Sequence, residues 1–242
     1  MTGARRRALL VAAIALLLLL AAAAIVASSG NSPRPRAEAD KPVLLLLTSL
    51  PIVFGEEFSL DPEPAPALTA LRGRYRVVPI STSDSRSLGQ GGLLLMAHPH
   101  AQTPDNLVSL DRWVRAGGGV LLLADPMLEW PSKRPLGDVL RPPPMFADTG
   151  LLGHWALRLD APAERGPAVR MLDGSPIETV SPGMLYGGCA IAPDRLTARC
   201  GIGNGRAVVI ADADFIRADP YDSGARRNLN ALLAELGKLE QG

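Results

Sequence analysis

The sequence is poor in several residue types that often carry chemistry. It has 3 histidines and 2 cysteines, and aromatic residues make up only 4% of its 242 positions. Its 25 Lys and Arg residues nearly balance its 24 Asp and Glu residues, and the two signs are mixed along the chain. Because nucleic acid is bound by a concentrated basic face, the lack of a basic stripe argues against a nucleic-acid partner.

Recognisable catalytic nucleophiles are also missing. No Gly-x-Ser-x-Gly or Gly-x-Cys-x-Gly sequence occurs anywhere in the chain, so the nucleophile turn of many α/β enzymes is absent. Neither Cys189 nor Cys200 has a histidine close by in the sequence to activate a thiolate. The sequence therefore predicts no catalytic residue, and it indicates no cofactor.

Leucine and alanine are abundant, and they form one long uncharged run near the N-terminus. Residues 8–27 carry no charge and follow a basic tail, residues 1–7, that contains three adjacent arginines. A helix of about 20 residues is about 30 Å long, which is enough to cross a bilayer. Secretory signals have a shorter apolar region, of about 7–15 residues, so we predict an uncleaved transmembrane anchor. A signal peptide cleaved after Ala27 is the alternative.

Either assignment places the bulk of the chain outside the cytoplasm. With an uncleaved anchor, the protein is a single-pass protein of the bacterial inner membrane, because no second apolar run of this length follows. Residues 28–41 are small, polar and proline-containing, which predicts a flexible tether. The folded domain is expected over residues 42–238.

The clearest structural pattern lies between Gly92 and Pro126. Residues 93–96 and 120–124 are short apolar runs bounded by turn residues, which is typical of strands buried on both faces. Between them, Thr103 can cap a helix that has Pro104 at its first position. Two buried strands joined by a helix must be parallel, with a right-handed crossover.

Three further apolar runs, at residues 43–47, 75–80 and 207–211, complete a sheet pattern. The proline in the second of these runs suits an edge strand better than a central one. A last helix is expected from about Ser223, with leucines spaced along one core-facing stripe. Five strand candidates with intervening helices predict an α/β fold, with a flavodoxin-like, mostly parallel, doubly wound sheet.

After Pro126, and up to the strand expected at residues 207–211, the sequence no longer alternates between strand and helix patterns. A long connection with a short helix near residues 136–140 comes first. Short runs punctuated by turn signals then predict a small antiparallel β insertion over about residues 155–203. Within it, residues 168–172 and 177–180 flank Asp173-Gly174-Ser175 in a hairpin pattern.

A second hairpin, residues 189–192 with 196–200, brings the two cysteines together. If it closes with a four-residue turn, Cys189 and Cys200 lie directly opposite each other. In an exported protein this arrangement favours a disulfide, whose short loop limits the stabilisation to about 3 kcal/mol or less. Two buried thiols are the alternative.

Polar residues follow three of the predicted strands and form a candidate ligand edge, because open α/β sheets bind ligands at the carboxyl ends of their strands. His98 and His100 follow one strand, Asp125 the next, and Asp212 and Asp214 the last. Alternate histidines and an Asp-x-Asp pattern are both able to bind metal ions. Aspartates at strand ends also cap helices and accept hydrogen bonds from loop amides, and a loop preceding a helix explains the histidines. We therefore assign no metal to these residues.

Two blocks of sequence carry a family resemblance. The first block runs from Leu93 to Pro126 and contains a strand followed by TPDNLVSLDRWVRAGGGVLLLADP. Together with GNGRAVVIADADF at residues 203–215 and the asparagine-containing last helix, it resembles the extracytoplasmic domain of ABC-transporter auxiliary proteins of the gliding-motility type. That resemblance implies a fold like class I glutamine amidotransferases. In those enzymes a nucleophilic cysteine occupies the turn after the strand corresponding to residues 120–124, and here that turn reads Ala124-Asp125-Pro126. The resemblance thus implies the fold without the activity.

Three functional hypotheses remain open from the sequence. The first is a non-catalytic, membrane-anchored extracytoplasmic auxiliary or interaction domain of an ABC-type transport or envelope system, with permease and ATPase subunits as partners. The second is a metal-dependent hydrolase that uses the candidate ligand edge. The third is a small-ligand sensor, whose site we expect to be lined by the loops after Met96, Ala124 and Ala211.

Overall fold

The structure, a computed structural model, describes residues 34–56, 64–217 and 223–241. The chain from Pro35 onward forms one compact unit. The anchor expected over residues 8–27 lies outside the described residues. Within the three described ranges, no helix combines the length and the apolar character needed to cross a bilayer.

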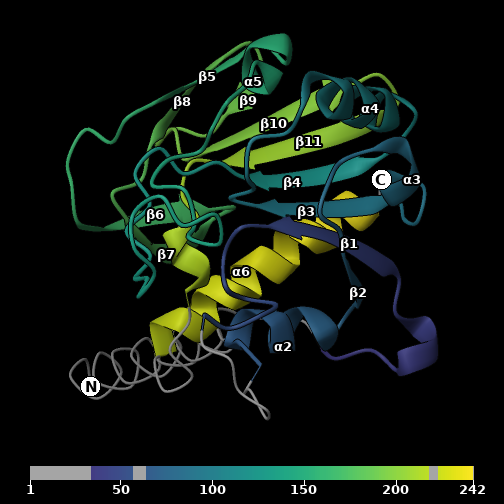
Figure 1. Cartoon of the computed structure of the whole chain (residues 1–242), viewed down its shortest axis with the longest axis horizontal. Coiled ribbons are helices and arrows are strands. Elements are labelled where there is room, and N and C mark those ends of the chain that lie inside the picture. The colour runs from purple at the N-terminus through teal and green to yellow at the C-terminus, as the bar shows by residue number, and fades with distance from the viewer. Residues whose placement is uncertain (1–33, 57–63, 218–222, 242) are drawn as a thin grey trace, which may run out of the picture. The chain divides into compact units, whose positions relative to one another are not determined.

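In the described part of the chain, one seven-stranded sheet organises the domain (Figure 1), with strand order β2-β1-β3-β4-β11-β10-β9. The strands from β2 to β11 in that order are parallel, and β10 and β9 are antiparallel. The fold is therefore mixed α/β with a mostly parallel central sheet, as the sequence predicts. The bounds of these strands are β1 Val43–Thr48, β2 Arg76–Pro79, β3 Leu93–Ala97, β4 Gly119–Leu123, β9 Ala190–Ile191, β10 Thr197–Ile202 and β11 Gly205–Ile210.

The apolar runs form strands because both faces of the sheet are covered. Successive side chains of a strand point to opposite faces, so Leu44 and Leu46 enter one core while Leu45 and Leu47 enter the other. All five residues of β3 and all five of β4 are buried. The strand that contains Pro79, β2, lies at the edge of the sheet, as predicted, where a missing N–H is tolerated.

Helices α2 (Pro66–Arg72) and α6 (Ser223–Glu240) pack on one face of the sheet, and α3 (Ser85–Leu88) and α4 (Pro104–Arg115) pack on the other. Figure 1 shows α6 running along the sheet, with α2 beside it. The start of α4 agrees with the prediction, because the Thr103 side chain accepts a hydrogen bond from the Asn106 amide at 3.3 Å.

The antiparallel strands form two small ribbons and an extension of the main sheet. The ribbons are β5 (Leu157–Asp160) with β8 (Met184–Gly187), after the short helix α5 (Leu151–His154), and β6 (Pro167–Leu172) with β7 (Ser175–Val180). The β6–β7 hairpin confirms the predicted pairing, and its turn has positive φ at Asp173 and Gly174, as two-residue hairpin turns require.

Two expectations differ from the structure here. The strands β9 and β10 do not belong to a separate insertion, because β10 pairs with β11 and so continues the main sheet. The helix expected near residues 136–140 does not form, and these residues make turns instead. Gly137, with a φ of 87°, interrupts the helical pattern, and Pro135 and Pro142 bound the stretch on either side.

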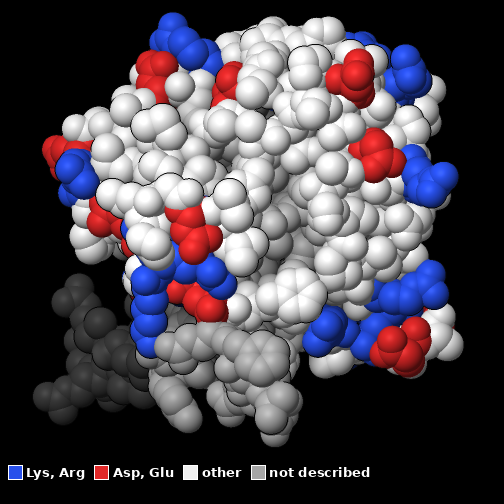
Figure 2. All heavy atoms as spheres, in the orientation of Figure 1, with Lys and Arg blue, Asp and Glu red and all other residues white. Residues whose placement is uncertain are grey.

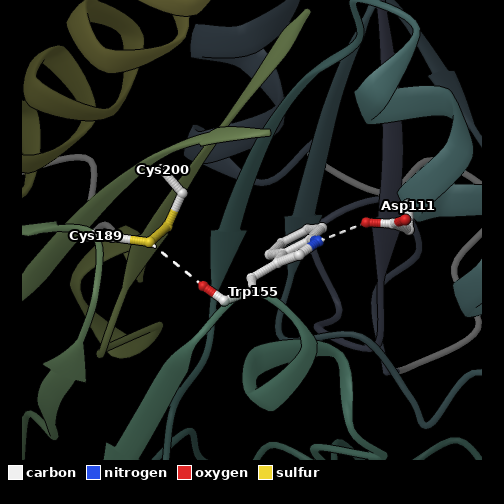
Figure 3. The surroundings of a disulfide bond; sticks show 4 residues. All are labelled: Asp111, Trp155, Cys189 and Cys200. Atoms are coloured by element: carbon white, nitrogen blue, oxygen red, sulfur yellow. Dashed lines mark hydrogen bonds between the residues drawn. A yellow bond between two sulfur atoms is a disulfide. The ribbon is translucent and has the colours of Figure 1, made fainter. Parts of the chain in front are cut away.

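The second hairpin is closed by a disulfide between Cys189 and Cys200, whose Cα atoms are 4.9 Å apart, as predicted. Figure 3 shows that the Cys189 sulfur contacts the Trp155 carbonyl oxygen, at 3.5 Å, and that the indole N–H of Trp155 donates to Asp111 at 3.0 Å. Asp111 belongs to α4, so these contacts connect the far edge of the sheet to a helix on its face.

The segment before β1 is folded against the domain over part of its length. Residues Glu38–Asp40 form the short 3-10 helix η1. The Arg36 amide donates to the Gly73 carbonyl at 2.9 Å, and the Arg36 guanidinium pairs with Glu240 at 3.0 Å. This attachment differs from the flexible tether expected over residues 28–41, of which residues 28–33 lie outside the described part.

Candidate functional site

The candidate ligand edge is assembled by three neighbouring strands. Since β3, β4 and β11 lie side by side in the sheet, the loops that follow them meet at its carboxyl edge. His98, Asp125, Asp212 and Asp214 all lie in these loops, and all are buried, with at most 4% of any of them exposed. His100, two residues after His98, is exposed.

Asp125 holds two loops together. Its Oδ1 accepts a hydrogen bond from the Met127 amide at 2.8 Å, within its own loop. Its Oδ2 accepts from the Ala213 amide at 2.8 Å, in the loop after β11. Both carboxylate oxygens are therefore used by backbone amides, which is the structural role that aspartates at strand ends commonly have.

Asp212 attaches the β6–β7 hairpin to the sheet. Its Oδ1 accepts from the Phe215 amide at 2.8 Å, and its Oδ2 accepts from the Val180 amide at 3.0 Å. Val180 is the last residue of β7. The Val180 amide points away from β6, so in the described part of the chain no strand accepts its hydrogen bond. The Asp212 carboxylate accepts it in place of a neighbouring strand.

Asp214 differs from the other two aspartates because one of its oxygens has no partner. Its Oδ2 accepts from the Glu129 amide at 2.7 Å, while its Oδ1 is buried without a hydrogen bond. Asp214 begins the 3-10 helix η2 (Asp214–Ile216). Through Glu129 it reaches the long connection after β4.

Burial governs the acidity of these three carboxyl groups. It raises the pKa of Asp125 to about 7, although the two amide hydrogen bonds act in the opposite direction. Burial, together with the neighbouring charge of Asp125, raises the pKa of Asp212 well above its usual range. The pKa of Asp214 is also raised by burial, against the effect of the Glu129 amide. Raised pKa values mark many catalytic acids, but here they arise in an enclosed, structural setting.

His98 is held in an unusual backbone conformation directly after β3. Its φ is 46°, in the left-handed region that few non-glycine residues adopt. The ring Nε2 lies 2.8 Å from the Pro143 carbonyl oxygen, so Nε2 carries the proton and donates, while the buried Nδ1 has no partner. Burial lowers the pKa of His98 to about 4, which keeps the ring neutral at neutral pH.

These positions do not assemble a metal site in the described residues, where no group of three histidine, cysteine or acidic side chains is arranged to bind an ion. Both cysteines are in the disulfide, so neither supplies a thiolate. The turn after β4, Ala124-Asp125-Pro126, has no nucleophile. The carboxylates of Asp125 and Asp212 are both occupied by backbone amides.

The connection after β4, residues 126–150, lies across this edge, and we call it the covering segment. The Phe146 amide donates to the Asp125 carbonyl at 2.6 Å, and the Leu128 amide donates to the Pro144 carbonyl at 3.0 Å. With the bonds to His98 and Asp214, these contacts hold the segment over the loops after β3, β4 and β11. The covering segment therefore buries much of these loops, although Asp214 and Arg217 of the loop after β11 also line a cavity of about 490 Å³ beside the β6–β7 hairpin.

Asn228 of α6 is a structural residue that the sequence pattern misses. It lies off the leucine stripe, yet only 4% of it is exposed. Its side chain accepts from the Glu178 amide at 2.9 Å and donates to the Glu178 and Phe215 carbonyls at 2.7 and 2.9 Å. An amide side chain next to a core stripe is the one signal in the sequence that could have indicated this role.

An open cavity of about 410 Å³ lies at the same edge but further along the sheet. It is lined by Thr48 and Ser49 at the end of β1, by residues 79–81 at the end of β2, and by His100 and Gln102 after β3. Of the three loops expected to line a ligand site, only the loop after Met96 reaches this cavity. The loops after Ala124 and Ala211 contact the covering segment and the β6–β7 hairpin, and the loop after Ala211 lines the separate cavity beside that hairpin.

The charged side chains of the surface do not gather into a large field of one sign on the face shown in Figure 2. Red and blue groups lie near one another around the margin, and the centre of this face is mostly uncharged. This distribution agrees with the net charge of +1 and gives no support to a nucleic-acid interface.

The geometry defines a class of fold, a mostly parallel α/β sheet with covered faces, and comparison with solved structures finds the same class. Comparisons with protein families and with curated proteins found no match to this chain.

Three solved structures illustrate the likeness. The chain is similar to the exo-beta-1,4-mannosidase Op5Man5 from Opitutaceae bacterium strain TAV5, with a TM-score of 0.51, 16% identity and 81% of this chain covered. It spans only 36% of that enzyme. The mmIFT52 N-terminal domain gives a TM-score of 0.52 at 14% identity, and cytoplasmic protein STM3548 from Salmonella typhimurium gives 0.51 at 11%. In both of these pairs, 82% of this chain and 98% of the other are covered. Such low identities establish a shared fold and nothing about activity.

Proposed function

We propose that this chain is a non-catalytic, extracytoplasmic interaction domain, anchored in the bacterial inner membrane by residues 8–27, that serves an ABC-type transport or envelope system. The sequence resemblance at residues 93–126 and 203–215 motivates the partner class. The fold is compatible with the resemblance: in chain order, the parallel strands follow the 2-1-3-4-5 order of flavodoxin-like sheets.

One observation carries the non-catalytic part of the proposal. At the edge where an enzyme of this fold would hold its reacting groups, both oxygens of Asp125 and of Asp212 accept hydrogen bonds from backbone amides. The two carboxylates together hold four backbone amides, two each, and neither can take up a metal ion or a substrate without releasing them. The disulfide supports the extracytoplasmic location, because such bonds persist in oxidising compartments.

The partner class is tested by affinity purification of the tagged full chain from membranes in mild detergent. We expect ATPase and permease subunits to be recovered with it. A matched control carries Leu16→Arg and Leu19→Arg, since each arginine costs about 3 kcal/mol at the centre of a membrane helix and should abolish the anchor. Recovery of neither subunit with the wild-type chain contradicts the transporter assignment.

The alternative, a metal-dependent hydrolase, has less support because His98 is buried against Pro143 while His100 is exposed. Metal analysis of the purified chain separates the two functions. Stoichiometric zinc or magnesium that is lost in His100→Ala or Asp214→Asn would favour the hydrolase. These two substitutions spare the amide-binding oxygens of Asp125 and Asp212, so they leave the fold in place.

A further inference from the structure

The cavity at the ends of β1, β2 and β3 lies where the connections of the sheet change direction. From β1 the chain passes through α2 to β2 at one edge, and from β3 it passes through α4 to β4 on the other side. The helices α2 and α4 lie on opposite faces, so the loops before them diverge and leave a crevice between the strand ends. Such crossover points are the usual ligand sites of open α/β sheets.

The strand ends that form the floor of the cavity are held rigidly. The Thr48 hydroxyl donates to the Ala97 carbonyl at 2.8 Å, and the Ser49 hydroxyl donates to the His98 carbonyl at 2.5 Å. Gln102 is only 9% exposed, and its Oε1 accepts from the Ser83 amide at 3.0 Å. Binding at such a prearranged surface needs little ordering of side chains.

Two walls of the cavity are braced against each other by Glu56. The Glu56 carboxylate accepts from the Lys133 amide at 2.8 Å, and the Glu56 carbonyl accepts from the Arg134 guanidinium at 3.1 Å. Residues 53–56 form one wall, and Arg134 and Leu140 of the covering segment belong to the other. The cavity is therefore present without any movement of the chain.

The lining indicates the chemistry of the occupant. Most of it is apolar, and two of its apolar side chains, Phe54 and Leu140, are 81% and 62% exposed. The guanidinium of Arg134 already lies 3.5 Å from the Asp138 carboxylate, so its charge is paired. The Oε2 atom of Glu56 accepts from the Lys133 amide, while its Oε1 atom is buried without a hydrogen-bond partner. The polar lining side chains that make no hydrogen bond within the described chain are those of Ser81 and His100.

We propose that this cavity binds an uncharged, mainly apolar small molecule that carries a hydroxyl or carbonyl group. The apolar body contacts Phe54, Leu140 and the leucines at the end of β1, and the polar group is bonded by Ser81 or His100. The volume of about 410 Å³ is within the range of small-molecule sites and accommodates a ligand of one or two rings. This inference goes beyond the partner proposed above and does not depend on it.

The test uses the full chain in detergent, with 4-fluorobenzyl alcohol as the probe. Binding is measured as the broadening of the ¹⁹F NMR signal of the probe, compared with the same probe in protein-free micelles. We expect saturable binding with a dissociation constant on the order of 1 mM, as a ligand of this size allows. The variants Ser81→Trp and Leu140→Trp, at exposed positions on two walls, should bind at least about tenfold more weakly because the indole fills the cavity. Gln90→Trp, exposed and outside the lining, is the matched control and should bind like the wild type.

Charged analogues test the stated chemistry, and thermal unfolding confirms that each variant is folded. We expect 4-fluorobenzoate and 4-fluorobenzylamine to bind more weakly than the alcohol. The inference is overturned if the wild type binds the alcohol no better than micelles do, if the folded tryptophan variants at Ser81 or Leu140 bind it as well as the wild type, or if a charged analogue binds as tightly. Should one of the two blocking variants not fold, the other decides.

Discussion

Replacing Asp212 by asparagine isolates the contact that attaches the β6–β7 hairpin to the sheet. Asparagine has the shape of aspartate, but it offers one accepting oxygen where Asp212 uses two, for the amides of Val180 and Phe215. One of these buried amides must then face an NH₂ group that cannot accept its hydrogen. We therefore expect Asp212→Asn to weaken the attachment of β7.

The expected cost follows from the price of an unpaired buried donor, about 1–3 kcal/mol. Removing a carboxyl group whose pKa is raised by burial offsets part of it. A group with a raised pKa stabilises the fold most below its unfolded value of 3.8, and this contribution is lost as the pH rises. The variant lacks this contribution of Asp212, whereas the other buried carboxyl groups with raised pKa values act in both proteins. The difference in stability between the wild type and the variant should therefore be larger at pH 5 than at pH 8.

Hydrogen–deuterium exchange of the full chain at pH 5 measures this effect locally. A loss of about 2 kcal/mol in the opening free energy makes the amides of β7 exchange about 30-fold faster. Asp214→Asn is the matched control. Since Oδ1 of Asp214 has no partner and only Oδ2 accepts, asparagine can keep the one bond, and we expect exchange to change by less than about threefold.

The reasoning is refuted if Asp212→Asn exchanges like the wild type over residues 175–180, or if Asp214→Asn accelerates exchange there by a similar factor. The first result would mean that the hairpin does not depend on the Asp212 carboxylate. The second would mean that lost charge, and not the lost acceptor, controls the attachment.

Three further outcomes follow from buried groups. Because the pKa of His98 is lowered to about 4, the free energy of unfolding should fall by about 3 kcal/mol as the pH falls from 6.5 through 4. In His98→Asn, whose asparagine tolerates the positive φ, urea titrations should show that this pH-dependent loss of stability is absent. Arg199→Met should destabilise the protein by about 2 kcal/mol, since Arg199 donates to the 1%-exposed Glu235 at 2.8 Å and the variant leaves that buried charge without this partner. Glu235→Gln removes the charge itself and should cost less. Equal losses of stability in the two variants would refute this reasoning. The double variant Cys189→Ser and Cys200→Ser should lose about 3 kcal/mol or less, with faster exchange concentrated in β9 and β10, and a uniform loss across the sheet would contradict a local effect.

The elements that were predictable from the sequence are those whose causes are local. The buried strands follow from short leucine and valine runs, the start of α4 follows from Thr103 and Pro104, and the β6–β7 turn follows from Asp173-Gly174. The cysteine pair was predictable as well, because a hairpin places its residues opposite each other within a few positions. The helix expected near residues 136–140 does not form for a local reason too, since Pro135 and Pro142 bound this short stretch and Gly137 has a positive φ.

The candidate site was predictable only in part, because its chemistry depends on which groups each side chain meets. The position of Asp125, Asp212 and Asp214 at one sheet edge followed from strand order. Their partners did not: Asp125 reaches an amide 88 positions away, Asp214 one 85 away and Asp212 one 32 away. No pattern of residues along the chain indicates contacts over such distances.

The sequence by itself thus determined the buried strands, their parallel arrangement, the hairpins and the disulfide, since periodicity and turn chemistry act between near neighbours. Only the tertiary structure decided that the aspartates serve loop amides, that Asn228 fastens a hairpin, and that the open cavity lies at the ends of β1 to β3. These features arise when the sheet brings distant loops together, and burial then requires each polar group among them to find a partner.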